Sequence, residues 1–316
     1  MNFRTVFNEK ELSEVRKPID YSSKIGLIGS CFVQNIGAKL AYYKFPHWIN
    51  PYGVLFSPLA IERLLHDVMH RRQYTTRDLV FDKEHWHSLH HHSDFSALHP
   101  EDVVSKINTQ IAQTAENLVS TTHLVITLGT AWVYRHLDRD EYVANCHKIP
   151  QKKFSKSLLS IAEIKESLTK SIQLLHAINP NLQIILTLSP VRHLKDGMLA
   201  NSRSKAHLLS AIHQLLSDTN VSYFPSYELL VDDLRDYRFY ATDMLHPDET
   251  AIDYIWHFFS NHWISKEAQV LMQEVEKVQK AMLHKPFNAT SQQHLEFLEK
   301  LNTQKEQLYK KYGLQF

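Results

Sequence analysis

Short apolar runs alternate with longer amphipathic segments along most of the chain. Four of these runs are rich in β-branched or aromatic residues and stop at a glycine, a serine or a proline, as strands buried in a parallel sheet do. The four runs cover residues 24–28, 124–128, 184–188 and 221–224. We predict a strand at each of them.

Segments with apolar residues at three- and four-residue steps predict helices. They cover residues 31–40, 58–71, 100–119, 161–177, 204–216 and 248–259. Strands that alternate with helices in this way predict a doubly wound, mostly parallel α/β sheet. Ligands bind outside the carboxyl ends of the strands in such sheets, so we expect the turns after the first three strands to meet at one rim.

The pattern changes after Trp263, where residues 265–283 and 291–312 have the periodicity of two charged amphipathic helices. We expect a main domain in residues 1–264, with a helical and histidine-rich insertion at about 54–120, and a helical hairpin in residues 265–316. The hairpin is expected to pack against the main domain or to join two copies in a homo-oligomer.

Composition narrows the class of protein. The chain has 316 residues, of which 43% are hydrophobic and 22% are charged, as in soluble globular proteins. A net charge of +1 provides no field to attract nucleic acid, so we expect no nucleic-acid partner. No stretch has the length of a membrane span or a signal peptide, so we expect a cytoplasmic protein with no membrane span.

The turn after the first predicted strand carries two nucleophilic side chains, Ser30 and Cys31. A helix follows directly, and the unpaired N–H groups and positive dipole end at its start favour an anion there. A cysteine at this position is suited to reactivity as a thiolate. The alternative is a small buried side chain that fills a gap.

Near the other end of the chain, Asp243 precedes His246 by three residues in a loop before a predicted helix. A carboxylate at this spacing can orient the imidazole and stabilise the imidazolium that forms when the histidine accepts a proton. The alternative is a capping aspartate with an unrelated surface histidine. Together with Ser30 and Cys31, the pair predicts a nucleophile–base–acid triad.

Two further groups of residues and one arginine carry possible chemistry. Histidines at 85, 87, 90, 91 and 92 supply imidazoles that bind metals such as zinc, but their irregular spacing favours a polar surface loop. Cys146 stands beside His147, although adjacent residues of an extended segment point to opposite faces. Arg192 can anchor a carboxylate or phosphate of a substrate, or form a structural ion pair. We expect no metal and no cofactor.

The motif Gly29-Ser30-Cys31-Phe32-Val33 resembles the glycine-serine-cysteine-phenylalanine-alanine motif that names the GSCFA family, with valine in the last position. Further segments resemble that family over nearly the whole chain: 50–53, 92–96, 129–132, 144–148 and 189–193. The family is related to the SGNH, or GDSL-like, hydrolases. The resemblance implies a three-layer α/β/α, flavodoxin-like fold.

The resemblance also implies roles for individual residues. Asp243 and His246 match the D-x-x-H block of SGNH hydrolases, and Cys31 aligns with their nucleophilic serine, while Ser30 remains the other candidate. Those relatives bind the oxyanion with a glycine and an asparagine. Gly53 matches the glycine, but Ala131 stands where the asparagine would be. The substitutes are Thr130, Asn50 and Asn145, and His92 is expected to line the cleft.

These features favour an esterase-type hydrolase or acyltransferase that forms an acyl-enzyme on Cys31 or Ser30. The sequence does not distinguish ester from thioester substrates. Cell-envelope glycans or lipids are suggested as substrates by analogy with the fold family. The missing asparagine keeps a second hypothesis open, an SGNH-like protein that binds an acyl-bearing ligand without turnover. A metal-dependent hydrolase built on the histidine cluster is a third.

Overall fold

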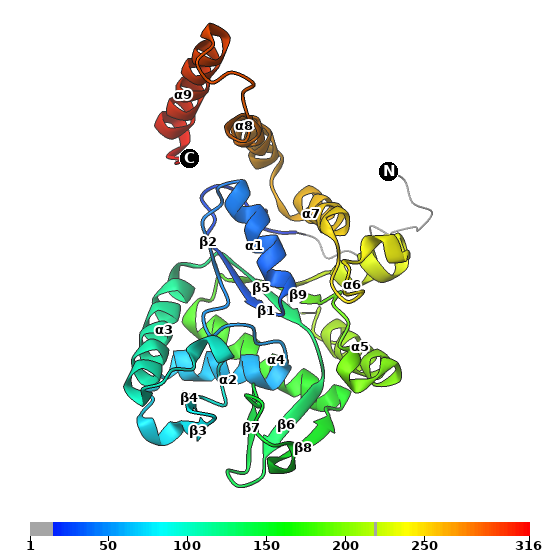
Figure 1. Cartoon of the computed structure of the whole chain (residues 1–316). Coiled ribbons are helices and arrows are strands. Elements are labelled where there is room, and N and C mark those ends of the chain that lie inside the picture. Colours follow the sequence, from blue (N-terminus) through cyan, green and yellow to red (C-terminus); the bar gives the residue numbers. More distant parts are fainter. Residues whose placement is uncertain (1–14, 218–219) are drawn as a thin grey trace.

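A five-stranded sheet forms the centre of the protein (Figure 1), and the computed structural model describes residues 15–217 and 220–316. Its strands are β1 (Ile25–Gly29), β2 (His47–Ile49), β5 (His123–Leu128), β9 (Gln183–Leu188) and β10 (Val221–Phe224). Their order is β10-β9-β5-β1-β2, and every neighbouring pair is parallel. Numbered along the chain, this is the 2-1-3-4-5 order of flavodoxin-like proteins.

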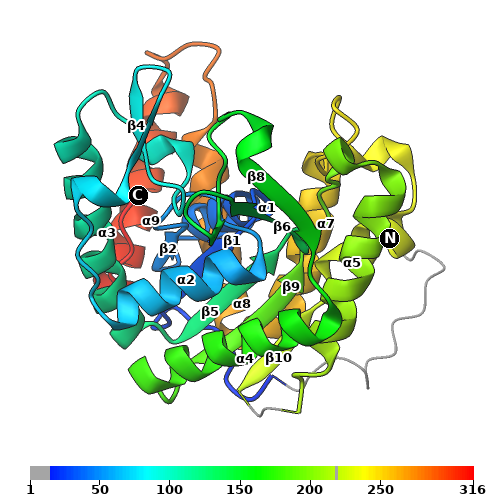
Figure 2. The same ribbon diagram turned by 90° about the horizontal axis from the view of Figure 1, so that it is seen from below.

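Helices cover both faces of the sheet (Figures 1 and 2). One face carries α2 (Pro58–Met69), α3 (Pro100–Ser120), α4 (Ile161–Ile178) and α5 (Met198–His213). The other carries α1 (Phe32–Tyr42), α7 (Glu249–Trp263) and the π-helix η6 (Leu229–Leu234), which follows the short α6 (Ser226–Glu228). The predicted three-layer α/β/α fold is confirmed.

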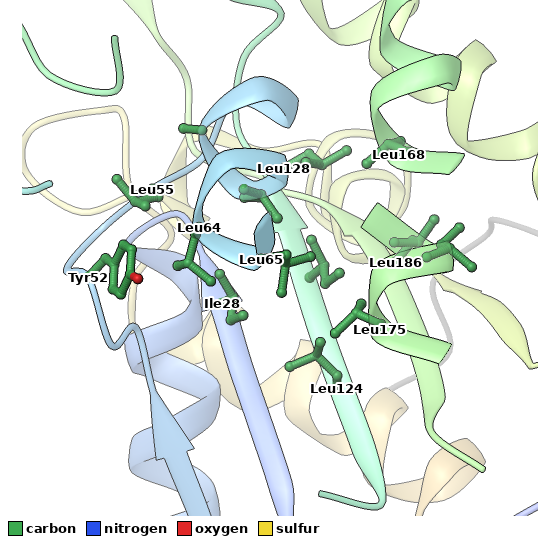
Figure 3. Close-up of a cluster of buried hydrophobic side chains, with 14 of the residues drawn as sticks. Ile28, Tyr52, Leu55, Leu64, Leu65, Leu124, Leu128, Leu168, Leu175 and Leu186 are labelled. Carbon is green, nitrogen blue, oxygen red and sulfur yellow. The ribbon is translucent and has the colours of Figure 1, made fainter. Parts of the chain in front are cut away.

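Alternate residues of the central strand β5 enter two different cores. Leu124 and Leu128 belong to the cluster under α2, α3, α4 and α5, whereas Val125 belongs to the cluster under α1 and α7. Figure 3 shows the first of these cores, with Leu65 of α2 and Leu168 of α4 close to the strand leucines. A strand buried on both faces needs apolar residues at every position, which explains the continuous apolar run in the sequence.

Two small antiparallel sheets are inserted between the main elements. β3 (Val80–Asp82) pairs with β4 (His85–His87), and β6 (Trp132–His136) lies between β7 (Glu141–Val143) and β8 (Phe154–Leu158). These strands were not predicted from the sequence, since they are short and half-exposed with mixed polarity. Single 3-10 turns lie at Thr76–Asp78, Ser93–Phe95, Gln151–Lys153, Leu194–Asp196 and Tyr237–Phe239.

Most predicted helices agree with the structure to within a turn, but α5 begins at Met198 rather than at Ser204. Its first turn escaped the periodicity because Met198 and Leu199 point to solvent, with 68% and 77% of their surface exposed. The predicted C-terminal helices are α8 (Lys266–Met282) and α9 (Gln292–Tyr312). Among the helices of the described residues, none combines the length and apolar character that crossing a bilayer requires.

Candidate active site

The turn after β1 presents Cys31 at the start of α1. Gly29 has φ 140°, and a Cβ at this position would lie 2.2 Å from the carbonyl oxygen of Thr127, so only glycine fits. The next residue, Ser30, donates its backbone N–H to the same Thr127 oxygen at 3.1 Å. Cys31 therefore follows a turn that is fixed to β5, at the switch point between β1 and β5 where flavodoxin-like sheets bind ligands.

His246 lies in a tight loop before α7 that Asp243 organises. One carboxylate oxygen of Asp243 accepts the backbone N–H groups of Leu245 and His246 at 2.9 and 3.0 Å. Met244 adopts φ 60°, which turns the chain back toward the aspartate. The other carboxylate oxygen lies 2.7 Å from His246 Nδ1.

The two segments meet in space, since Cys31 Sγ lies 3.3 Å from His246 Nε2. A carboxylate can only accept a hydrogen bond, so the contact with Asp243 assigns the proton of neutral His246 to Nδ1. Nε2 is then free to accept the thiol proton. The side chains of His246 and Asp243 are 44% and 46% exposed, so solvent reaches the imidazole.

The protonation states fit this arrangement. Backbone N–H donors from His246 and Leu245, with the contact to the imidazole, lower the pKa of Asp243 to about 2. Burial raises the pKa of the Cys31 thiol, an effect that the backbone N–H groups at the start of α1 partly offset. At neutral pH the aspartate is ionised and the thiol keeps its proton, so His246 has a proton to remove.

The Ser30 hydroxyl forms a hydrogen bond within its own turn. Ser30 is 2% exposed, and its hydroxyl accepts a hydrogen bond from the backbone N–H of Phe32 at 3.3 Å. Of the two candidate nucleophiles, Cys31 contacts His246, whereas the Ser30 hydroxyl contacts the backbone of Phe32.

Residues 24–259 match the GSCFA family, and residues 275–316 match the C-terminal domain of GSCFA domain proteins. The chain belongs to the GSCFA family. The motif that gives this family its name is therefore the turn that carries the candidate nucleophile. No curated protein matches the sequence.

Solved esterase structures resemble this GSCFA protein only distantly. A carbohydrate esterase family 3 protein from Talaromyces cellulolyticus has 8% identity and a TM-score of 0.35, over 81% of this chain and 99% of that one. A serine-to-alanine mutant of an acetyl esterase with acetate ion has 11% identity and a TM-score of 0.36, over 81% and 99%. An acetyl xylan esterase from the rumen bacterium Butyrivibrio proteoclasticus has 11% identity and a TM-score of 0.39, over 77% and 65%.

Asn50 directly follows β2 and contacts the turn after β1 that carries Cys31. Its side-chain oxygen accepts the backbone N–H of Gly29 at 2.8 Å. Its amide nitrogen Nδ2 is buried and has no hydrogen-bond partner among the described residues. A buried donor without a partner carries a desolvation cost that a ligand oxygen would relieve.

Two of the other oxyanion candidates, Gly53 and Thr130, are already engaged in hydrogen bonds. The backbone N–H of Gly53 donates to the Asn50 carbonyl at 2.8 Å, and the Thr130 hydroxyl pairs with Ser204 Oγ at 3.0 Å. The side-chain oxygen of Asn145 accepts the backbone N–H of His147 at 2.9 Å, a contact that does not involve the Nδ2 donor an oxyanion would need. Gly53 has a packing role as well, because a Cβ there would lie 2.2 Å from the Cβ of His92.

A cavity of about 390 Å³ lies between the loops after β2 and β5 and the sheet of β6, β7 and β8. His92, Thr130 and Asn145 line it, together with Trp132 and His193. His193 lines this cavity, whereas Cys31, Asp243 and His246 do not. Burial, with a smaller effect of the Lys205 charge, lowers the pKa of His193 to about 4, so the ring is neutral at pH 7.

Arg192 contacts Tyr240 rather than the cavity. Its guanidinium donates to the Tyr240 hydroxyl at 3.2 Å, and its backbone N–H donates to the Leu245 carbonyl at 3.3 Å. These contacts brace the loop that carries His246. Substrate anchoring by Arg192 stays a prediction.

The histidine-rich segment differs from the predicted polar surface loop. His90 and His91 are 8% and 0% exposed, because this segment packs under the loop after β7. His90 lies 3.3 Å from Glu141, whereas His91 contacts the Ser88 hydroxyl at 2.7 Å. Across residues 15–217 and 220–316, no group of three or more histidine, cysteine, aspartate or glutamate side chains converges as metal ligands do.

Cys146 and His147 lie in a turn, since His147 and the following Lys148 have φ 47° and 60°. The His147 ring contacts the Ser88 carbonyl at 2.7 Å, and burial raises the pKa of Cys146 to about 11. Both residues line the cavity. A Cys146–His147 catalytic pair has no hydrogen bond between the two side chains to support it.

Lys205 lies on α5, is only 2% exposed, and was not among the residues predicted from the sequence. Its ammonium donates to the Ser189 carbonyl at 2.7 Å and acts electrostatically on Cys31. A lysine in an amphipathic helix is normally solvated, so nothing in the sequence pattern singled it out.

Proposed function

We propose that this GSCFA protein is an esterase-type hydrolase that cleaves acyl esters or thioesters through an acyl-enzyme on Cys31. The contact of 3.3 Å between Cys31 Sγ and His246 Nε2 carries the proposal. A carboxylate oxygen of Asp243 lies 2.7 Å from the other ring nitrogen, Nδ1. A thiol, a base and an orienting carboxylate in this order are what nucleophilic acyl transfer requires.

In the proposed reaction, His246 Nε2 removes the Cys31 proton as sulfur attacks the substrate carbonyl carbon. The imidazolium, stabilised by Asp243, returns that proton to the departing alcohol or thiol, which leaves an acyl thioester on Cys31. Water then loses a proton to His246 and attacks this thioester. The carboxylic acid departs, and Cys31 regains its proton.

Two donors are proposed for the oxyanion: the backbone N–H of Cys31 at the start of α1 and the buried Nδ2 of Asn50. The unpartnered amide of Asn50 supports the second. The cavity of about 390 Å³ is proposed to receive the part of the substrate beyond the reacting carbonyl. Solvent access to His246 favours water as the acceptor over an alcohol or amine, so hydrolysis is preferred to acyl transfer.

The test is turnover of nitrophenyl acetate and an acetyl thioester by the wild type, Cys31→Ala, Ser30→Ala and His246→Ala. Cys31→Ala and His246→Ala should each lose at least about 10³-fold in kcat, and an acetyl adduct should form on Cys31. His257→Ala, an exposed histidine of α7, is the matched control and should keep full activity. Loss of turnover in Ser30→Ala with retention in Cys31→Ala would refute the assigned nucleophile.

A wild-type protein that folds but neither turns over these substrates nor forms an adduct would favour a binding protein instead. Product captured by an added alcohol, in competition with water, would change the assignment from hydrolase to acyltransferase.

A further inference from the structure

The 3-10 turn Leu194–Asp196, between β9 and α5, forms a strap along one side of the cavity. Lys195 and Asp196 line the cavity from this strap. None of its three side chains is buried, and Leu194 leaves 42% of its surface exposed. A segment with so few buried apolar contacts opens locally more easily than the core does. Polar contacts must therefore hold the strap in place.

The inserted sheet forms another wall of the same cavity. Trp132 and Tyr134 are two positions apart on β6, so their side chains lie on one face, and both line the cavity. Lys156 of β8 stands opposite Tyr134 in the antiparallel register and shares this face. Its ammonium lies 4.7 Å from the centre of the Trp132 ring and 5.6 Å from that of Tyr134. Lys156 thus lies on the cavity side of the sheet.

An ion pair between Lys156 and Asp196 joins the two walls. In the parts of the chain that the structure describes, no other salt bridge connects the strap with β6, β7 or β8. The two side chains are 29% and 14% exposed, so water and salt reach the pair. Partly exposed ion pairs contribute little to stability and are screened by salt. This connection can therefore break without disturbing the fold.

The chain is free to turn directly after the strap. Gly197 has φ 90°, and a Cβ at this position would meet nothing within 4 Å. The next two residues, Met198 and Leu199, point to solvent with 68% and 77% of their surface exposed. Hinges commonly lie at the ends of helices, where a few residues absorb the change in backbone angles.

The other end of the strap is fixed. The backbone N–H of His193 donates to the Asn201 side chain at 2.9 Å, and that of Arg192 donates to the Leu245 carbonyl at 3.3 Å. Only residues 194–196 lie between this attachment and Gly197. A movement of these residues would separate Asp196 from Lys156 and leave the loop beside His246 in place.

We propose that the strap is a gate to the cavity, closed by the Lys156–Asp196 ion pair and opened by movement of residues 194–196 about Gly197. A ligand too large to pass beside the closed pair has to break it. Use of the gate by an ester substrate rests on the proposed function, whereas the gate itself does not.

Cys146 can report on the gate, because it lines the same cavity and is one of only two cysteines in the chain. The test compares its rates of reaction with N-ethylmaleimide and with the larger N-(1-pyrenyl)maleimide, measured on the Cys146 peptide by mass spectrometry. Both reagents are uncharged. The ratio of the two rates cancels any change in the pKa of the thiol.

Lys156→Met keeps an aliphatic side chain over Trp132 and removes the charge. It should raise the rate with the pyrenyl reagent several-fold relative to the ethyl reagent, and Asp196→Asn should do the same. The double variant should gain no more than either single variant, since the two side chains act as one pair. Lys153→Met, an exposed lysine of the preceding 3-10 turn, is the matched control and should keep the wild-type ratio.

Salt supplies the same test without a substitution. Raising the salt concentration from about 0.1 M to about 1 M should move the wild-type ratio toward that of Lys156→Met and leave the variant unchanged.

Wild-type ratios in both folded single variants would overturn the proposal and leave the strap as a fixed wall. Additive effects in the double variant, or a wild-type ratio that salt does not move, would also overturn it. Neither readout needs turnover, so failure of the gate is distinct from failure of the proposed hydrolase.

Discussion

At the scale of single residues, one glycine controls where the candidate nucleophile lies. Gly29 combines φ 140° with a close approach to the Thr127 carbonyl, and both conditions exclude a side chain. We expect Gly29→Ala to lower the free energy of unfolding by about 3 kcal/mol, since backbone strain and the clash act together. Urea unfolding measures this.

Gly197→Ala is the matched control for Gly29→Ala. Gly197 has φ 90°, but a Cβ at this position would meet nothing within 4 Å. Gly197→Ala should lower the free energy of unfolding by about 1 kcal/mol, because only backbone strain opposes it. Equal losses at the two positions would show that the contact with Thr127 is unimportant.

The buried amide of Asn50 gives a second prediction at this scale. Asn50→Asp keeps the oxygen that accepts the Gly29 N–H and removes the unpartnered Nδ2. If Nδ2 binds the oxyanion, kcat for nitrophenyl acetate should fall by about 10²- to 10³-fold. Asn145→Asp introduces the same charge change at the other asparagine candidate. A larger loss at Asn145 than at Asn50 would reverse the assignment.

The residues of the site differ in how far the sequence could predict them. Asp243 and His246 are three positions apart, so their contact is local and the sequence motif reveals it. Their approach to Cys31 across the fold needed the predicted sheet and the family resemblance as well. Lys205 and the free Nδ2 of Asn50 are properties of burial, and no spacing in the sequence encodes whether a polar atom finds a partner.

At the scale of elements, continuity of the apolar pattern decided what was predictable. The central strands are buried on both faces, so their apolar runs were plain in the sequence. β6 and β8 have one face in solvent and carry charged residues such as Arg135 and Lys156. The part of the cavity wall that residues 132–134 of β6 form was therefore not predicted. The sequence offered a triad and single lining residues such as His92, but not the shape of the cavity.

Trp132 tests whether this inserted sheet shapes substrate choice. Its side chain lines the cavity and donates to the Ala200 carbonyl at 3.1 Å. Trp132→Ala should enlarge the cavity, so the ratio of kcat/KM for nitrophenyl octanoate to that for nitrophenyl acetate should rise roughly tenfold. Tyr142→Ala, on the neighbouring β7 and outside the cavity lining, is the control. An unchanged ratio in Trp132→Ala would place the substrate elsewhere.

At the scale of the whole molecule, the C-terminal helices and the candidate site occupy opposite ends of α1 (Figure 1). Gln279 of α8 donates to the Tyr42 carbonyl at 2.7 Å, at the last residue of α1, whereas Cys31 precedes its first. The 11 residues of α1 separate the two by about 16 Å. The division into a main domain and a hairpin, and a role of the hairpin in oligomers, stay predictions.

This separation predicts that the hairpin affects stability without affecting catalysis. Val275 of α8 is fully buried in a cluster with Leu301 and Leu308 of α9, while Val270 of the same helix is 61% exposed. Val275→Ala should lower the free energy of unfolding by about 2 kcal/mol, because it leaves a cavity that the neighbours fill only in part. Val270→Ala should change it by less than about 0.5 kcal/mol.

Both valine variants should keep the wild-type kcat/KM at temperatures well below their unfolding transitions. Urea unfolding and ester turnover, measured on the same preparations, separate the two properties. A fall in kcat/KM for folded Val275→Ala would mean that α1 transmits changes from the hairpin to Cys31. The C-terminal helices would then have to be regarded as part of the active machinery rather than as a support for the far end of the fold.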